Sequence, residues 1–187
     1  MIKSFKIRLY PTKDQEQLMW KHIGCCRYIW NYMLALQQQR YENGEKHLSA
    51  FGMIGQIQPL KTDGKHSWLY DVSNASLQVI CRDLDKAYET FFRKTRGYPK
   101  FKSRKHSKQS FPTRCGYRTY FVNDQFVKIE KFGRVRYRTD FEFAHGRNIL
   151  NFLNPRISNK NGKWLLTFGL ECENQAPELT NESLGID

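Results

Sequence analysis

The spacing at which apolar residues recur changes twice along this chain, and this restricts the folds that the chain can adopt. Phe5, Ile7 and Leu9 alternate with polar or charged residues, as in a half-buried strand, and Pro11 ends that strand. From residue 12 to about residue 95 the apolar residues recur at helical spacing, and beyond Gly97 the two-residue alternation returns. One strand, a helical block and several further strands predict an α+β protein, in which a small β-barrel is interrupted by a helical insertion.

Local signals predict where the first helices begin and end. Thr12 followed by Gln15 is a capping box, so a helix is expected from there to about His22. Gly24 is expected to break or bend it before a second helix begins. The apolar stripe of that second helix comprises Cys26, Ile29, Trp30, Met33 and Leu36.

Two further helices are expected in the helical block. The first is short and weak, and its apolar residues are Phe51, Ile54 and Ile57. Pro59 should end it, and Ser73 is the expected N-cap of a stronger amphipathic helix. The apolar stripe of that helix comprises Leu77, Ile80, Leu84, Tyr88 and Phe91.

The later strands are expected to be half-buried. Val135 and Tyr137 alternate with basic residues, which should therefore line one face: Arg134, Arg136 and Arg138. Apolar residues at every second position of 164–172 predict another strand, introduced by the turn Asn161-Gly162. Its partner is expected at residues 149–157, which gives a hairpin.

Basic residues dominate the charge, with 31 Lys and Arg against 18 Asp and Glu and a pI near 9.6. Residues 90–123 contain no acid, ten Lys or Arg, and interleaved aromatic residues (Phe91, Phe92, Tyr98, Phe101, Phe111, Tyr117, Tyr120 and Phe121). Because cations neutralise phosphates and aromatic faces stack on exposed bases, this segment favours nucleic acid over a membrane surface or a merely solvated loop. The predicted phosphate contacts are Arg93, Lys94, Arg96, Lys100, Lys102, Arg104, Lys105 and Lys108. The last five lie in a stretch without apolar periodicity and are all expected to be exposed.

Several other classes of site are disfavoured. No apolar run approaches the roughly 20 residues that cross a bilayer, and no apolar segment follows Lys3, so an intracellular protein without membrane contact is expected. Five cysteines without a Cys-x-x-Cys pair predict buried reduced thiols rather than disulfides or a zinc knuckle. The scattered histidines are expected to be exposed or internally satisfied.

The end of the chain differs from the rest. After Lys163 there is no basic residue, and five carboxylates make this end acidic, so it should lie outside the polyanion surface. Residues 174–177 (Asn-Gln-Ala-Pro) read as a linker, and 184–187 (Leu-Gly-Ile-Asp) read as the start of a buried strand. The chain is therefore expected to be one part of a longer protein.

A series of motifs, in this order and spacing, resembles the TnpB proteins of bacterial insertion sequences. These proteins are also called OrfB transposases and are related to the type V CRISPR nucleases. The motifs include Arg-Leu-Tyr-Pro-Thr at 8–12 with Gln15, Gly-Cys-Cys-Arg-Tyr-Ile-Trp-Asn at 24–31, and Leu-Gln at 77–78. They continue at 82–88, 91–92, 97–103, 110–111, 162–164 and 184–187. One departure is Ile-Glu-Lys-Phe-Gly at 129–133, where members often have Leu-Pro-Lys-x-Gly.

The resemblance implies the N-terminal half of such a protein, located in the bacterial cytoplasm at the nucleoid. Residues 1–11 and 96–173 would form a wedge-type, oligonucleotide-binding-like β-barrel, with a helical recognition domain at 12–95. Residues 174–187 would be a linker and the start of a RuvC-like nuclease domain. The implied partners are a guide RNA from the transposon end and a double-stranded DNA target.

The resemblance also implies roles for individual residues. Asp187 matches the first of three carboxylates that bind Mg²⁺ in the nuclease domain, so the chain alone is not expected to cut DNA. Gln78 matches a reader of the short DNA motif beside the target, and an amide suits adenine, although an exposed glutamine can simply be solvated. Asn74 and Phe51 match neighbouring positions, and Phe51 is favoured as a core residue. Arg27 either reaches RNA or packs its stem and pairs with an acid, and the second reading is favoured.

Two functional classes remain open at this stage. One is the recognition half of an RNA-guided DNA endonuclease. The other is a binder without catalysis, such as a nuclease-dead repressor or a solitary recognition module. A ribosomal-type RNA-binding protein would explain the charge and the aromatic residues but not the ordered motifs.

Overall fold

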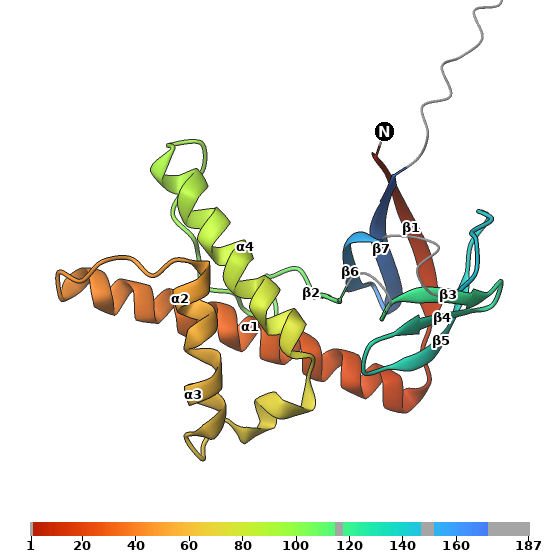
Figure 1. The fold of residues 1–187 in the computed structure, drawn as a ribbon, viewed down its shortest axis with the longest axis horizontal. Coiled ribbons are helices and arrows are strands. Elements are labelled where there is room, and N and C mark those ends of the chain that lie inside the picture. The colour runs from red at the N-terminus through yellow and green to blue at the C-terminus, as the bar shows by residue number, and fades with distance from the viewer. Residues whose placement is uncertain (1, 115–117, 147–151, 172–187) are drawn as a thin grey trace, which may run out of the picture.

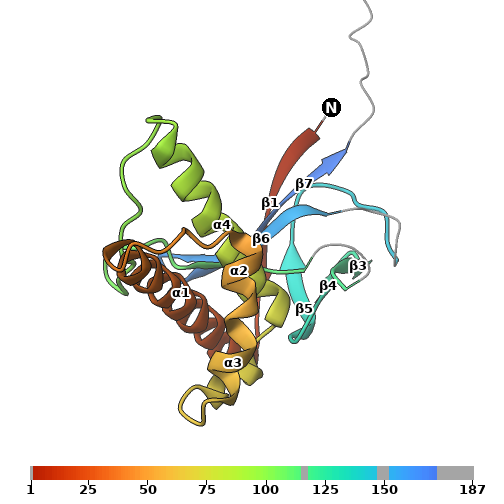
Figure 2. The same ribbon diagram turned by 60° about the vertical axis from the view of Figure 1, so that its left-hand side comes forward.

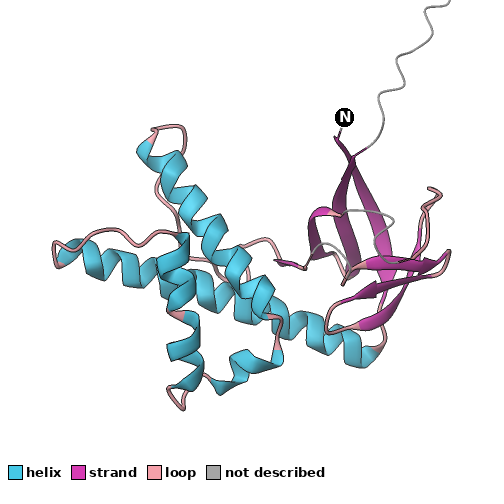
Figure 3. Ribbon diagram, in the orientation of Figure 1, coloured by secondary structure: helices cyan, strands magenta, loops and turns pink. Residues whose placement is uncertain are grey.

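The computed structural model describes residues 2–114, 118–146 and 152–171, and combines a helical region with one antiparallel sheet (Figures 1 and 3). The helices are α1 (Lys13–Glu42), α2 (Ala50–Gly55), α3 (Ile57–Thr62), the 3₁₀ helix η1 (Ser67–Asp71) and α4 (Asn74–Phe92). The strands are β1 (Ile2–Tyr10), β2 (Ser110–Pro112), β3 (Tyr120–Asn123), β4 (Phe126–Ile129), β5 (Gly133–Arg138), β6 (Leu153–Lys160) and β7 (Lys163–Glu171). The α+β class is confirmed.

The strands form an open sheet in the order β2-β6-β7-β1-β5-β4-β3. β1 lies at its centre and pairs with β7 from Ile2 to Leu9, whereas its pairing with β5 is confined to the last residues before Pro11. A barrel requires the two edge strands to pair with each other. Within the described residues β2 and β3 do not pair, so closure into a barrel is not confirmed.

Helix α1 is continuous through Gly24, so the predicted break there is wrong. A helical glycine costs roughly 1 kcal/mol, which is small beside the burial of Met19, Ile23, Ile29 and Met33 on either side of it. Packing therefore outweighs the local preference.

The start of α1 is pinned to the sheet. The predicted capping box is confirmed: Gln15 N–H donates to Thr12 Oγ1 at 3.3 Å, and Thr12 N–H donates to Gln15 Oε1 at 3.0 Å. Gln15 Nε2 also donates to the carbonyl oxygens of Phe132 and Arg134, both at 2.9 Å. One side chain thus closes the helix end and attaches it to the turn between β4 and β5.

The remaining helices follow the predicted pattern with corrections. In α4 the stripe residues Leu77, Ile80, Leu84 and Tyr88 are buried, as predicted. The short helix is instead two helices, because Pro59 lies in the first turn of α3, where its missing N–H is not needed. Phe51 is 79% exposed, so the core assignment for this residue is wrong. Ser73 is the N-cap residue of α4, but its hydroxyl donates to Glu130 Oε2 at 2.9 Å rather than capping the helix.

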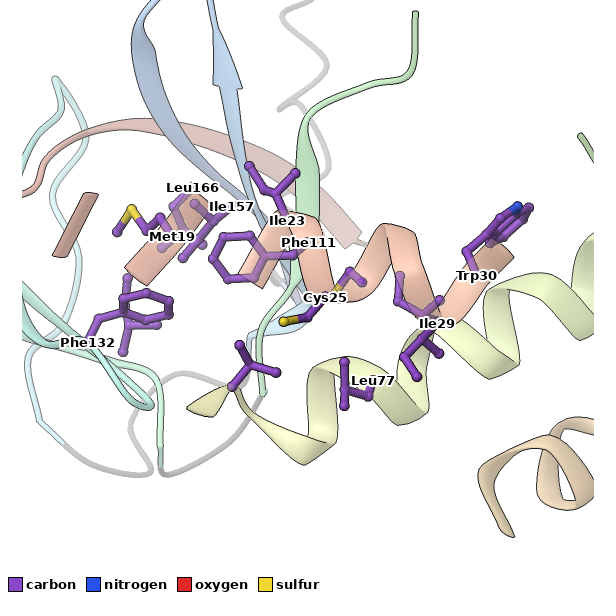
Figure 4. Packing of buried hydrophobic residues seen from close by; sticks show 14 of the residues in the cluster. Met19, Ile23, Cys25, Ile29, Trp30, Leu77, Phe111, Phe132, Ile157 and Leu166 are labelled. Carbon is purple, nitrogen blue, oxygen red and sulfur yellow. The ribbon is translucent and has the colours of Figure 1, made fainter. Parts of the chain in front are cut away.

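One hydrophobic core joins the helical region to the sheet. Figure 4 shows Met19 and Ile23 of α1 beside Phe111, Ile157 and Leu166 from the strands. The same cluster continues along α1 to residues packed against α4, and Figure 1 shows α1 running from the helical region to the sheet. Figure 2 shows the two regions from another side, with α1, α2 and α4 on the left and β3, β4 and β5 on the right. The two regions therefore do not have separate cores.

The described cysteines are part of this core. Cys25, Cys26 and Cys81 are buried and free, and burial raises the pKa of the Cys25 thiol to about 11 and of the Cys81 thiol to about 12, which keeps them unreactive. Cys115 and Cys172 lie outside the described residues.

Among the residues with described positions, no helix is both long and apolar enough to cross a bilayer.

Candidate nucleic-acid interface

One face of the sheet carries a row of basic side chains. On β5 the exposed residues Arg134, Arg136 and Arg138 alternate with the buried Val135 and Tyr137, as predicted. The register places Arg8 of β1 opposite Arg138, Tyr10 opposite Arg136, and Lys128 of β4 opposite Arg134. We call the basic residues of these three strands the basic sheet face: Lys6, Arg8, Lys128, Arg134, Arg136 and Arg138.

The basic sheet face lacks compensating acids. None of its arginines forms an ion pair with any described residue. Like charges directly opposite each other on neighbouring strands destabilise a sheet by a few tenths of a kcal/mol, and a bound phosphate would remove that cost. Arg8 also lies over the Tyr10 ring, 4.9 Å from its centroid. The sequence showed Lys6 and Arg8 alternating with apolar residues, but only the register brings Arg8 beside an arginine of β5, whereas Lys6 lies opposite Thr167 of β7.

A second basic element is the connection between α4 and β2, residues 93–109, which we call the basic loop. It is docked on α1 by two consecutive side chains. Trp30 Nε1 donates to the Lys100 carbonyl at 3.0 Å, Asn31 Nδ2 donates to the Lys102 carbonyl at 2.9 Å, and Lys102 N–H donates to Asn31 Oδ1 at 2.7 Å. These bonds anchor the backbone of the basic loop at Lys100 and Lys102, so this part of the loop lies against α1 before any ligand binds.

Lys102 is not exposed, which corrects the prediction for that residue. Its ammonium lies 3.5 Å from the centroid of the Trp30 ring. Burial lowers the pKa of Lys102, and the negative charge of Asp83 partly offsets this. The predicted exposure is confirmed for Lys100, Arg104, Lys105 and Lys108, none of which forms an ion pair with a described residue.

The three basic residues that follow α4 are exposed as well: Arg93, Lys94 and Arg96. Lys94 has a φ of 58°, and its N–H donates to the Phe91 carbonyl at 2.8 Å, which is a left-handed helix end. Cations here also interact favourably with the helix dipole, so their position has a structural explanation beside the predicted phosphate contact.

The aromatic residues of 90–123 divide into two groups. Phe111 and Phe121 are fully buried core residues, so the prediction that they stack on bases is wrong. Phe92, Tyr98 and Phe101 are exposed by 64%, 40% and 54% and remain available for stacking. Tyr117 lies outside the described residues.

The predicted motif readers are only partly brought together. Asn74 and Gln78 lie one turn apart on the same side of α4, and Asn74 Oδ1 accepts a hydrogen bond from Lys61 Nζ at 3.0 Å. Gln78 is half-buried, and its amide has no hydrogen bond within the part of the chain described. Phe51 is on α2, and although α2 packs against α4, no measured interaction joins Phe51 to the other two.

Arg27 differs from the favoured expectation. Its stem is half-buried on α1, but its guanidinium has no acidic partner among the described residues. The pairing with an acid is therefore wrong, and the cation is free to meet an anion.

The metal prediction cannot be placed in the structure. Asp187 lies outside the described residues, and within those that are described no group of three His, Cys, Asp or Glu side chains could hold a metal ion. The described residues therefore do not fit a Mg²⁺ site.

Comparison with known proteins found a matching domain family. Residues 1–46 match the helix-turn-helix domain family of OrfB proteins from IS605-type insertion sequences. In this structure the matched range contains β1 and one uninterrupted helix, α1, rather than two helices and a turn.

Three curated relatives were found. The whole chain is 30% identical to the "Putative RNA-guided DNA endonuclease InsQ" of Escherichia coli strain K12 and spans 45% of its length. It is 31% identical over 58% of its length to a "Putative RNA-guided DNA endonuclease" of Streptomyces pristinaespiralis, covering 27% of that protein. It is 26% identical, again over 58% of its length, to the virulence protein VsdF of Salmonella dublin, covering 98% of that protein.

These findings define the class first, because residues 1–46 match the helix-turn-helix domain of OrfB proteins from insertion sequences. More particularly, the chain is homologous over its whole length to the TnpB family of RNA-guided DNA endonucleases. It spans less than half the length of the two relatives that are named as endonucleases.

Proposed function

We propose that this chain is the wedge and recognition part of a transposon-encoded RNA-guided DNA endonuclease, which binds a guide RNA and reads a short motif beside a double-stranded DNA target. The observation that carries the proposal is the basic loop, whose backbone is anchored on α1 by Trp30 and Asn31 in a chain homologous to such proteins. An anchored loop backbone favours phosphate binding by the cations that it carries, because less backbone entropy is lost on association.

The proposal assigns the two basic elements to nucleic acid. The basic sheet face belongs to the proposed wedge at 1–11 and 96–173, and α1 to α4 belong to the proposed recognition domain at 12–95. The barrel and the start of a nuclease domain at 174–187 remain part of the proposal, as does a location at the bacterial nucleoid. Cleavage with Mg²⁺ would require Asp187 together with carboxylates outside this chain.

RNA binding by the purified chain should depend steeply on salt. We expect the combined substitutions Lys100→Gln, Arg104→Gln and Lys105→Gln to lower the slope of log K against log salt by about two to three units, because each phosphate contact contributes about 0.7 to 0.9. Electrophoretic or fluorescence titrations of a structured RNA at several salt concentrations measure this slope. The matched control is Lys46→Gln, Lys65→Gln and Lys86→Gln, which removes the same charge elsewhere. If both triple variants kept the native slope, the basic loop would lie outside the interface.

Motif reading is tested at Gln78. Its free amide on α4 can pair bidentately with adenine N6 and N7, so Gln78→Ala should weaken preference at one motif position by about 1 to 3 kcal/mol and leave non-specific DNA affinity nearly unchanged. Selection from a randomised DNA library with the guide-loaded protein gives the preference at each position. Gln17→Ala, an exposed glutamine on α1, is the control. The same base preference in both variants would make Gln78 a surface residue only.

A binding function without catalysis is the second candidate. The match to VsdF covers 98% of that protein, so VsdF has almost no sequence outside the matched region. RNA or DNA binding by the isolated chain is expected under both candidates, and guide-directed cleavage by the longer protein supports only the first.

A further inference from the structure

A cavity of about 330 Å³ lies where the helical region meets the sheet, and we call it the junction cavity. Its walls come from α1, α4, the basic loop, β2 and β6. The residues on these walls that bear on its chemistry are Arg27, Asp83, Lys102, Ser107, Lys108 and Arg156. Arg156 of β6 was not identified from the sequence, because nothing local distinguishes it from other arginines.

The charges around the junction cavity do not balance. Four cations line it, from Arg27, Lys102, Lys108 and Arg156, against the single carboxylate of Asp83. That carboxylate is already paired with Arg156. Arg27 and Lys108 have no acidic partner among the described residues, and the ammonium of Lys102 lies over the Trp30 ring without an ion pair to a described acid. Arg27 is half-buried and Lys108 is exposed, so both reach the cavity with their charges uncompensated, and cations that outnumber the acids around one small space attract an anion.

Hydroxyl groups add directed donors beside these cations. The Ser107 hydroxyl oxygen accepts the N–H of Ser103 at 2.8 Å, and the Ser103 hydroxyl oxygen accepts the N–H of His106 at 3.0 Å. Both serines line the cavity, and each O–H proton remains available to donate. Several cations and two hydroxyl donors around one small space match the oxygens of a phosphate group. The same charges exclude a metal cation.

We propose that the junction cavity binds a phosphate group, with Arg27 and Lys108 as its principal charged contacts. That this phosphate belongs to the backbone of a bound nucleic acid rests on the proposed function. The affinity for a phosphate group as such does not, so a free phosphate is the other source that the experiment must separate.

The first arm uses inorganic phosphate and the purified chain. Phosphate should raise the thermal unfolding temperature more than chloride at matched ionic strength. In Arg27→Gln and Lys108→Gln its apparent affinity should fall about tenfold or more, the effect of losing one charge-assisted hydrogen bond. Arg82→Gln, an exposed arginine on α4 outside the cavity, should behave as the native chain does.

The variants are also compared without phosphate. Arg27→Gln should then be at least as stable as the native chain, because it removes an uncompensated cation, and exposed Lys108 should be replaceable without loss of folding. The same phosphate-induced stabilisation in native chain, Arg27→Gln and Lys108→Gln would overturn the proposal.

The second arm identifies the source of the phosphate. If a backbone phosphate enters the cavity, Arg27→Gln should lower the salt slope of RNA binding by about 0.7 to 0.9. An unchanged RNA slope with a lost response to inorganic phosphate would support the anion site and assign it to a free phosphate. Absence of any RNA binding by the native chain would refute the proposed function, whereas the first arm would still decide the phosphate site.

Discussion

His22 is a fully buried polar residue whose charge state follows from its neighbours. Its ring packs against Phe111 and Phe132, with centroids 5.1 and 4.7 Å away. Nδ1 donates to the Leu18 carbonyl at 2.9 Å, and Nε2 accepts the N–H of Ser73 at 3.1 Å. Because one partner is a carbonyl and the other an N–H, only the neutral ring satisfies both. Burial is the main reason why the pKa of His22 falls to about 4.

This histidine should make stability depend on pH. In the unfolded chain its pKa is near 6.5, so between about pH 6.5 and 4 the unfolded state binds more protons than the folded state. The contribution is complete above about pH 6.5 and is lost as the pH falls toward 4. Between about pH 7.5 and pH 5 we expect a loss of about 2 kcal/mol, at 1.36 kcal/mol per pKa unit. Urea unfolding of the native chain and of His22→Gln measures it.

The comparison isolates one group among several that titrate. His22→Gln removes the histidine term, so the difference in unfolding free energy between the two pH values should be smaller in the variant than in the native chain. An equal pH dependence in both proteins would mean that His22 is already protonated in the fold, contrary to its hydrogen bonds.

Residue roles could be predicted where the partners are close in sequence and not where they are distant. The capping box of Thr12 and Gln15 was predictable because its two residues are three positions apart. The docking of the basic loop was not, since Asn31 and Lys102 are separated by 71 positions. For the same reason the burial of Lys102 and the exposure of Phe51 could not be inferred from local periodicity.

At the scale of the elements, α1 tests the balance between propensity and packing. A Cβ built on Gly24 meets nothing within 4 Å outside the helix itself, so the glycine is not required for space. Gly24→Ala should raise the free energy of unfolding by about 0.5 to 1 kcal/mol, because alanine loses less backbone entropy in a helix. Urea denaturation measures the change.

Gly64→Ala is the matched control for this prediction. It also has open space around its Cβ, but its φ of +79° is unfavourable for alanine, so this change should destabilise the chain. A loss of stability in Gly24→Ala would show that the helix bends at Gly24 in solution, as the sequence alone predicts.

A strand could be predicted where its alternating pattern and its turn both lie within one short stretch of sequence. In β7 the buried residues Trp164, Leu166, Phe168 and Leu170 alternate with less buried ones, as predicted. The turn before it has positive φ at Asn161 and Gly162, which Asn-Gly favours. Closure of the sheet was not predictable in this way, because it depends on how two edge strands far apart in the chain approach each other.

For the whole molecule, composition indicated the class of partner but not the geometry of the interface. A formal net charge of +13 favours a polyanionic partner, and the acid-free segment contains the basic loop that we propose as part of the interface. The basic sheet face and the junction cavity arise only when β1, β5 and β6 take their places beside the other elements. The α+β class could be predicted because the order of two-residue and helical periodicities along the chain can be read from the sequence alone.

Because α1 is unbroken, it fixes the distance between the sheet and the docked basic loop. The residue that ties α1 to the sheet, Gln15, and the residue that docks the basic loop, Trp30, are 15 positions apart, which is about 22 Å along the axis at about 1.5 Å per residue and comparable to about six or seven steps of duplex DNA at 3.4 Å each. One end is tied to the sheet through Gln15, and the other half carries α4 and the docked basic loop. A rod of fixed length holds the two cationic surfaces at a set spacing, so a nucleic acid that touches both must present its phosphates at that interval.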